Sequence, residues 1–195
     1  MSLLAESLVE EWLNRDGFFT VRGVKHGVDE VDLLAVRPAE AAEKLEAWHV
    51  EVQASFRPIG YISPLSERIK KETNKPGGTA WKRTDDLLHE CVDEWVRKKF
   101  HAVGKVAVRN RAWPGLQWKL VFAHAATRYP AELELIAAHG ISLLPFQTIL
   151  HDLCHHKRGD LMGAAGTDIA DIVRYYAQTA GADANTRPVR SRPSS

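Results

Sequence analysis

Two segments in the first third of the chain carry acidic side chains within patterns that otherwise specify buried β-strands. Residues 28–36 read VDEVDLLAV, which places Asp32 in a run of Val and Leu. In residues 47–54, the apolar Trp48, Val50, Val52 and Ala54 alternate with His49, Glu51 and Gln53. A period of two puts the polar set on one face of a strand. Burying Asp32 costs several kcal/mol unless it is compensated, and a divalent cation shared with Glu51 would compensate it.

The surrounding pattern predicts an α/β fold with a mixed central sheet flanked by helices. Proline, glycine and the hydrophobic periodicity divide the chain into short elements. Helices are expected at residues 3–15, 81–100, 130–138, 145–154 and 168–180, and strands at 18–22, 28–36, 47–54, 103–108, 116–123 and 141–144.

The composition fits one soluble domain. The chain has 195 residues, of which 45% are hydrophobic and 26% charged. We expect a single domain over residues 1–180, with a basic loop inserted at 55–80, and a disordered tail at 181–195. The sequence has no apolar run of membrane-spanning length and no leader pattern, which predicts a cytoplasmic protein without a membrane partner.

The charges are unevenly distributed along the chain. Residues 1–54 contain 5 basic and 11 acidic residues, whereas residues 97–128 contain 8 basic and no acidic residues. Residues 55–83 contain 7 basic and 2 acidic residues. Positive segments beside an acidic centre are typical of a protein that binds a polyanion around a metal site, although a charge run is also the ordinary composition of a solvated surface.

The order of elements and the acidic residues together resemble the PD-(D/E)XK nuclease superfamily, which has the restriction-endonuclease-like fold, and within it the resolvase and restriction-enzyme branch. The matching residues are Glu6 in the first helix, Glu30-Val31-Asp32-Leu33-Leu34, and Val50-Glu51-Val52-Gln53. The resemblance covers residues 5–54, and beyond them it is only an order of elements.

This resemblance implies a metal-dependent endonuclease that hydrolyses phosphodiester bonds, and we expect DNA as the substrate. Asp32 and Glu51 would hold Mg²⁺, for which Mn²⁺ substitutes, and Glu6 would complete the metal site. Mg²⁺ favours a few carboxylates together with water and substrate phosphate. Such an ion activates water and neutralises charge on the phosphate. Because one active site cuts one strand, a homodimer is also expected.

Gln53 occupies the position where most of the superfamily has lysine. An amide can orient a water molecule but adds no positive charge to the transition state. A lysine on the following helix would supply that charge, and Lys82 is the candidate, with Lys70 and Lys71 as alternatives. The departure at Gln53 also leaves open an inactive relative that keeps the fold as a nucleic-acid-binding or partner-docking module.

Cations interspersed with aromatic residues outside the acidic centre suit phosphate contact and base stacking. The residues expected to contact nucleic acid are Arg57, Lys70, Lys71, Lys75, Arg83, Arg109, Arg111 and Trp113. A second group near the end of one expected helix has residue types that can bind zinc: His151, Asp152, Cys154, His155 and His156. It lacks a second pair of ligands nearby in sequence, so the end of an amphipathic helix is the favoured interpretation.

Overall fold

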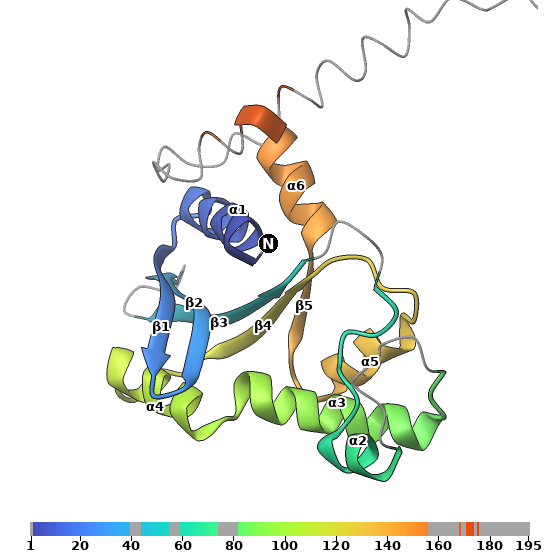
Figure 1. Ribbon diagram of the computed structural model, residues 1–195. Helices are drawn as coiled ribbons and strands as arrows, with labels where there is room; N and C mark the ends of the chain where they lie inside the picture. The colour runs from blue at the N-terminus through green and yellow to red at the C-terminus, as the bar shows by residue number, and fades with distance from the viewer. Residues whose placement is uncertain are drawn as a thin grey trace, which may run out of the picture.

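The computed structural model describes residues 2–39, 44–54, 59–73, 82–155, 168, 171–173 and 175. It is an α/β structure built on a mixed five-stranded sheet with strand order β1-β2-β3-β4-β5 (Figure 1). The strands are β1 (Phe19–His26), β2 (Asp29–Pro38), β3 (Leu45–Gln53), β4 (Lys119–His124) and β5 (Ser142–Pro145). The first three strands are antiparallel neighbours, and β3, β4 and β5 run parallel. These findings confirm the α/β class with a mixed sheet.

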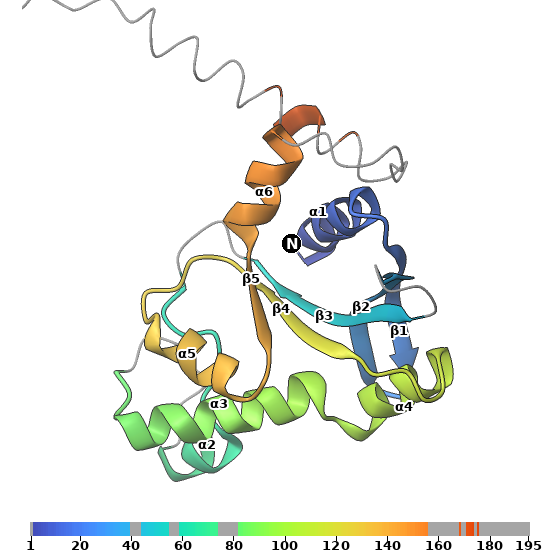
Figure 2. The same cartoon turned by 180° about the vertical axis from the view of Figure 1, so that it is seen from behind.

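Helices cover both faces of the sheet (Figures 1 and 2). One face packs against α1 (Ser2–Arg15) and α6 (Phe146–His155), through a core that includes Leu13, Leu33, Val50 and Ile149. The other face packs against α3 (Asp85–Phe100) and α5 (Ala131–Ala138), with α4 (Val103–Ala112) over β1 and β2. The short helix α2 (Glu67–Thr73) packs on α3.

Alternation along β3 separates these two cores, as its sequence predicts. Val50 and Val52 belong to the core beneath α1 and α6. His49 points the other way and lies 5.3 Å from Phe100 of α3, measured between ring centroids. The polar face of β3 is therefore directed toward the layer formed by α3 and α4, where His49 and Glu51 are fully buried and Gln53 is half-buried.

The prediction of a strand at residues 103–108 was wrong, because this segment forms most of α4. Three residues on α4, Lys105, Val108 and Arg109, are buried at a spacing of three and four, which is the helical period. The valines that suggested a strand are tolerated because tertiary contacts outweigh the weak preference of β-branched residues for strands.

The other predicted elements that lie within the described residues are present, with shifts of their ends. The helix expected at residues 81–100 begins at Asp85, and the strand expected at 116–123 begins at Lys119. The basic loop lies partly outside the described residues, and so do most of the helix expected at 168–180 and the whole tail at 181–195. No helix among the described residues is both long and apolar enough to cross a membrane.

Candidate functional site

The structure places Asp32 and Glu51 on the same side of the sheet. The antiparallel register pairs Leu33 with Val50, so the next step along the two strands sets Asp32 opposite Glu51. Because Leu33 and Val50 face the α1 side, their neighbours face the α3 and α4 side. The backbone N–H of Val52 donates to Asp32 Oδ2 over 2.8 Å. The two acids that the sequence singled out therefore converge.

Glu51 is fully buried and is held by three side chains. His49 Nε2 lies 2.8 Å from Oε1, which also accepts a hydrogen bond from Lys105 Nζ, while Lys99 Nζ lies 3.2 Å from Oε2. Burial by itself would raise the pKa of Glu51, but the hydrogen bond from His49 and the charges of Lys99 and Lys105 hold this pKa below its ordinary value. Glu51 is therefore a carboxylate with nearby cations.

Asp32 is in the opposite electrostatic situation. Burial and the neighbouring negative charge of Glu51 raise the pKa of Asp32 from 3.8 to about 6, against the smaller effects of Lys99 and the Val52 N–H. A carboxyl group that is half-buried beside another carboxylate favours its protonated form. The pair is consequently asymmetric, because Glu51 is compensated and Asp32 is not.

His49 and Arg109 form a buried support beneath Glu51. Arg109 Nη1 lies 2.6 Å from His49 Nδ1 and 2.8 Å from the Phe100 carbonyl oxygen. Because the guanidinium can only donate, Nδ1 accepts and the Nε2–H of His49 donates to Glu51. Burial lowers the pKa of His49, although the hydrogen bond to Glu51 opposes this effect, which is consistent with a neutral ring.

Lys99 is the residue that links the acids predicted from sequence. Its burial alone would lower its pKa, but the negative charges of Glu51, Asp32 and Glu6 raise it. Glu6 lies on α1 and is only 7% exposed. All three predicted metal ligands thus act electrostatically on one ammonium group. Among the described residues, however, no group of three or more acidic, histidine or cysteine side chains is arranged to hold a metal ion.

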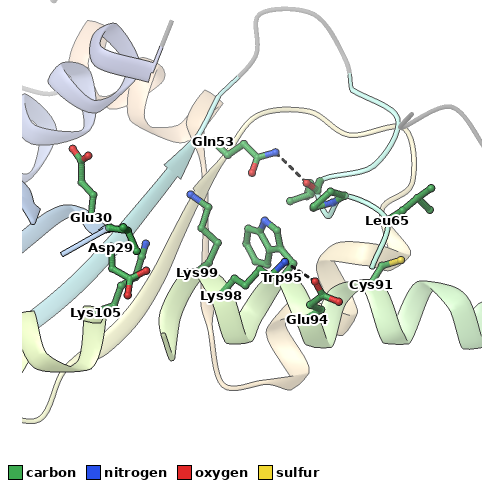
Figure 3. A pocket seen from close by; sticks show the side chains of 13 residues that line it. Asp29, Glu30, Gln53, Leu65, Cys91, Glu94, Trp95, Lys98, Lys99 and Lys105 are labelled. Carbon is green, nitrogen blue, oxygen red and sulfur yellow. Dashed lines mark hydrogen bonds and ion pairs between the residues drawn. The ribbon is translucent and has the colours of Figure 1, made fainter. Parts of the chain in front are cut away.

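A cavity of about 450 Å³ lies between the end of β3 and α3 (Figure 3), and two of its lining lysines, Lys99 and Lys105, contact Glu51. Lys99, Lys105 and Gln53 line it, together with Trp95 and Leu65. Gln53 Nε2 donates to the Ile62 carbonyl oxygen over 3.2 Å. The amide of Gln53, which the sequence predicts to orient water, therefore lies at the cavity wall, two residues after Glu51 on β3.

Lys82 does not join this group. It is exposed and precedes α3, whereas Lys99 lies in the last turn of the same helix. Fourteen residues separate the first residue of α3 from Lys99, which corresponds to about 21 Å along the axis. The lysines that contact Glu51 are Lys99 and Lys105. The lysine of α3 beside the acids is therefore Lys99, at the opposite end of this helix from Lys82.

Two residues that were expected to contact nucleic acid are buried instead. Arg83 donates to Ser63 Oγ over 2.9 Å and to the Ser63 carbonyl oxygen over 2.8 Å, and it stacks on Tyr61. Arg109 supports His49, as described above. Both guanidinium groups hold the fold together because each satisfies a buried acceptor, and neither is exposed to a ligand in solution.

The other predicted contact residues are exposed or lie outside the description. Lys70 pairs with Glu67 on α2, and Lys71 is exposed. Arg111 and Trp113 are exposed at the end of α4. Arg57 and Lys75 lie outside the described residues. His151 and His155 stack on each other with ring centroids 4.5 Å apart.

Sequence reasoning missed His49, Lys99 and Lys105 as site residues. His49 could have been predicted from the sequence, because the alternation places it on the same polar face of the strand as Glu51. The two lysines lie in the all-basic segment 97–128, which marked them as part of a positive surface. Their contacts with a residue 48 and 54 positions earlier follow from the packing of α3 and α4 and leave no local pattern.

Comparisons with known proteins do not name a family. No protein-family model matches the chain, and no curated protein does so either. Among solved structures, a protein of unknown function, AF1548, is similar with 13% sequence identity and a TM-score of 0.44. The match covers 82% of this chain, which spans 62% of the length of that protein.

Proposed function

We propose that this protein is a metal-dependent endonuclease of the PD-(D/E)XK superfamily, with a restriction-endonuclease-like core, and that it hydrolyses phosphodiester bonds of DNA. One observation carries the proposal: Asp32 and Glu51 converge from adjacent strands beside Lys99, which also lines a cavity. An acid pair next to a lysine combines ligands for a hard cation with a positive charge for a phosphate.

The side chains present fit a magnesium site with two protein ligands. Asp32 Oδ2 accepts from Val52 N, and Asp32 Oδ1 accepts no hydrogen bond from any described residue. On Glu51, Oε2 is contacted by Lys99 alone among the described residues. Two carboxylates suffice for Mg²⁺, which retains several waters and takes further oxygens from a phosphate. Glu6 as a third ligand, and a homodimer as the acting form, remain parts of the proposal.

Within this proposal each residue has a distinct role. Mg²⁺, when bound, would lower the pKa of a water molecule and offset charge on the scissile phosphate. Gln53 presents an amide at the cavity wall, where it can orient water. Lys99 replaces Lys82 as the cation, because its ammonium lies next to the acids and lines the cavity. His49 and Arg109 hold Glu51 in place.

A second candidate function is supported by the contacts of Glu51. Lys105 and Lys99 pair with this carboxylate, so its negative charge is compensated within the protein without a metal ion. A fold retained as a nucleic-acid-binding or partner-docking module, without hydrolysis, would have this arrangement. The two candidates differ in whether the acids are needed for cleavage.

Nicking of a supercoiled plasmid separates these candidates. With Mg²⁺ we expect nicking that EDTA abolishes and that Asp32→Ala reduces by at least about a hundredfold, because a ligand to a catalytic ion contributes several kcal/mol. Binding of the plasmid should be retained. The matched control is Asp93→Ala, an exposed acid on α3. Binding without Mg²⁺-dependent nicking would support the module instead, and absence of both would contradict the two candidates together.

A further inference from the structure

The cavity beside the acid pair has the size of a site for a small organic group. Its volume is about 450 Å³, within the range of about 300–1,000 Å³ that is typical of small-molecule sites. Figure 3 shows Lys99 and Trp95 on α3 below Gln53 of β3, with Leu65 at the opposite side of the cavity from Lys99. Lys99 lines the cavity and also contacts Glu51, so this lysine connects the cavity with the acid pair.

One wall of the cavity is fixed by a buried carboxylate. Glu132 on α5 is fully buried and accepts from the backbone N–H groups of Ile62 and Ser63 over 2.6 and 2.7 Å. Arg83 holds Ser63 from the other side. Ile62 lines the cavity and its carbonyl oxygen accepts from Gln53. These bonds hold the wall in position without a ligand, which lowers the entropic cost of binding one.

The charges around the cavity are mostly paired with one another. Lys98 pairs with Glu94, and Glu30 pairs with Lys25. Asp29 accepts from the backbone N–H of Gly104. Lys99 and Lys105 contact Glu51. The lining away from Lys99 and Lys105 therefore suits an uncharged group, because its charged side chains already have partners within the protein.

The remaining lining suits a ring with polar edges. Ile62, Leu65 and Trp95 supply apolar and aromatic surface, and Gln53 Oε1 accepts no hydrogen bond from any described residue. An apolar slot with one free amide oxygen matches a nucleobase, which has flat faces and N–H donors at its edge.

We infer that this cavity receives the base and sugar of an unpaired nucleotide while the adjoining phosphate lies against Asp32 and Glu51. This inference rests on the proposed function and narrows its substrate to single-stranded or flapped nucleic acid. A base within a duplex must first be unpaired and unstacked, which costs free energy. An unpaired base does not bear that cost and enters directly.

Equilibrium binding tests the inference without requiring cleavage. The probes are a fluorescent oligothymidylate and a duplex of equal length, measured by anisotropy in EDTA and again in Ca²⁺. We expect the single strand to bind at least about tenfold more tightly than the duplex. Pro64→Trp places a ring over the cavity from an exposed position, and it should remove this preference by weakening strand binding alone. Leu45→Trp, on the rim of a different surface hollow, is the matched control and should change neither affinity.

The possible results separate this inference from the proposed function. Equal binding of strand and duplex, or a Pro64→Trp protein that is folded by circular dichroism and keeps the preference, would overturn the inference whether or not the protein cleaves. Failure to bind either probe would overturn it as well. A Pro64-dependent preference for the single strand in a protein that never nicks DNA would support the cavity site while contradicting the hydrolase.

Discussion

At the scale of single residues, two acids in equivalent places on neighbouring strands are opposite in their electrostatics. Glu51 has three side-chain partners, and these hold its pKa below the ordinary value in spite of burial. Asp32 has one backbone partner, and burial together with Glu51 raises its pKa to about 6. The uncompensated acid is therefore the one that gains most from an added cation.

The raised pKa of Asp32 predicts a pH-dependent gain in stability for Asp32→Asn. The folded-state pKa exceeds the ordinary value, so the stability that protonated Asp32 contributes is lost as the pH rises through 6. Asparagine keeps an acceptor for the Val52 N–H without the charge. We expect the free energy of unfolding to rise by about 1–3 kcal/mol at pH 8 and the gain to vanish toward pH 4, in urea titrations at both values.

Asp93→Asn is the control for this measurement, because Asp93 is exposed on α3. Asp93→Asn should change the free energy of unfolding only slightly, and this change should not increase between pH 4 and pH 8 as it does for Asp32→Asn. An Asp32→Asn protein that is no more stable than the wild type at pH 8 would contradict the electrostatic description of the acid pair.

At the scale of elements, the start of α4 decides whether Lys105 reaches Glu51. The backbone N–H of Gly104 donates to Asp29 Oδ2 over 3.1 Å, which fixes this helix end against the first residue of β2. A Cβ atom on Gly104 would overlap the Asp29 side chain, including its Cβ at 2.7 Å. Glycine is therefore required at this position by close approach, although it weakens a helix intrinsically.

Gly104→Ala should consequently destabilise the protein, although the same change in an open helix stabilises it. We expect a loss of about 1–3 kcal/mol in the free energy of unfolding, as is typical of overpacking. The double variant Asp29→Ala, Gly104→Ala removes the obstructing carboxylate and should recover part of the loss. Urea denaturation of the two single variants and the double variant measures this coupling. If the effects of the two substitutions on the free energy of unfolding were additive, the predicted steric overlap between residues 29 and 104 would be contradicted.

The elements also show what the sequence could and could not predict. Alternation along residues 47–54 correctly predicted which side chains of β3 face the α1 core. A strand with one apolar face can be recognised because its apolar and polar residues alternate in the local sequence. Residues 103–108 were misread, since the contacts that make Lys105, Val108 and Arg109 one buried face lie on other elements. For the same reason the acids were found from the sequence, whereas Lys99 and Lys105 required the packing of α3 and α4.

At the scale of the whole molecule, the two faces of the sheet have different chemistry. The α1 and α6 face packs through an apolar core, whereas the face covered by α3, α4 and α5 combines an apolar core with the acid pair, the lysines and the cavity. The basic segment 97–128 supplies both buried and exposed cations. Arg109 is buried, and Arg111 is exposed two residues later. Within this positive segment, some cations are therefore buried and support the fold, whereas others lie on the surface.

This division predicts different effects of two neighbouring arginines on nucleic-acid binding. Arg111→Ala should lower the salt dependence of binding by about one counterion and weaken binding severalfold at low salt, because it removes one surface cation. Arg109→Ala should lower thermal stability, because it leaves His49 and the Phe100 carbonyl without their donor. Anisotropy titrations over a salt series and thermal unfolding curves measure the two effects. Arg97→Ala is the control for an exposed arginine outside the predicted contact set.

The crossover from β3 to β4 contains α2, α3 and α4, so the acids and the lysines that pair with them belong to successive stretches of the chain. During synthesis Asp32 and Glu51 are translated before Lys99 and Lys105. Until the helical crossover is complete, Glu51 has no ammonium partner from α3 or α4, and burying it in the sheet would leave its negative charge uncompensated. Burial of Glu51 therefore depends on the crossover that follows it in the chain.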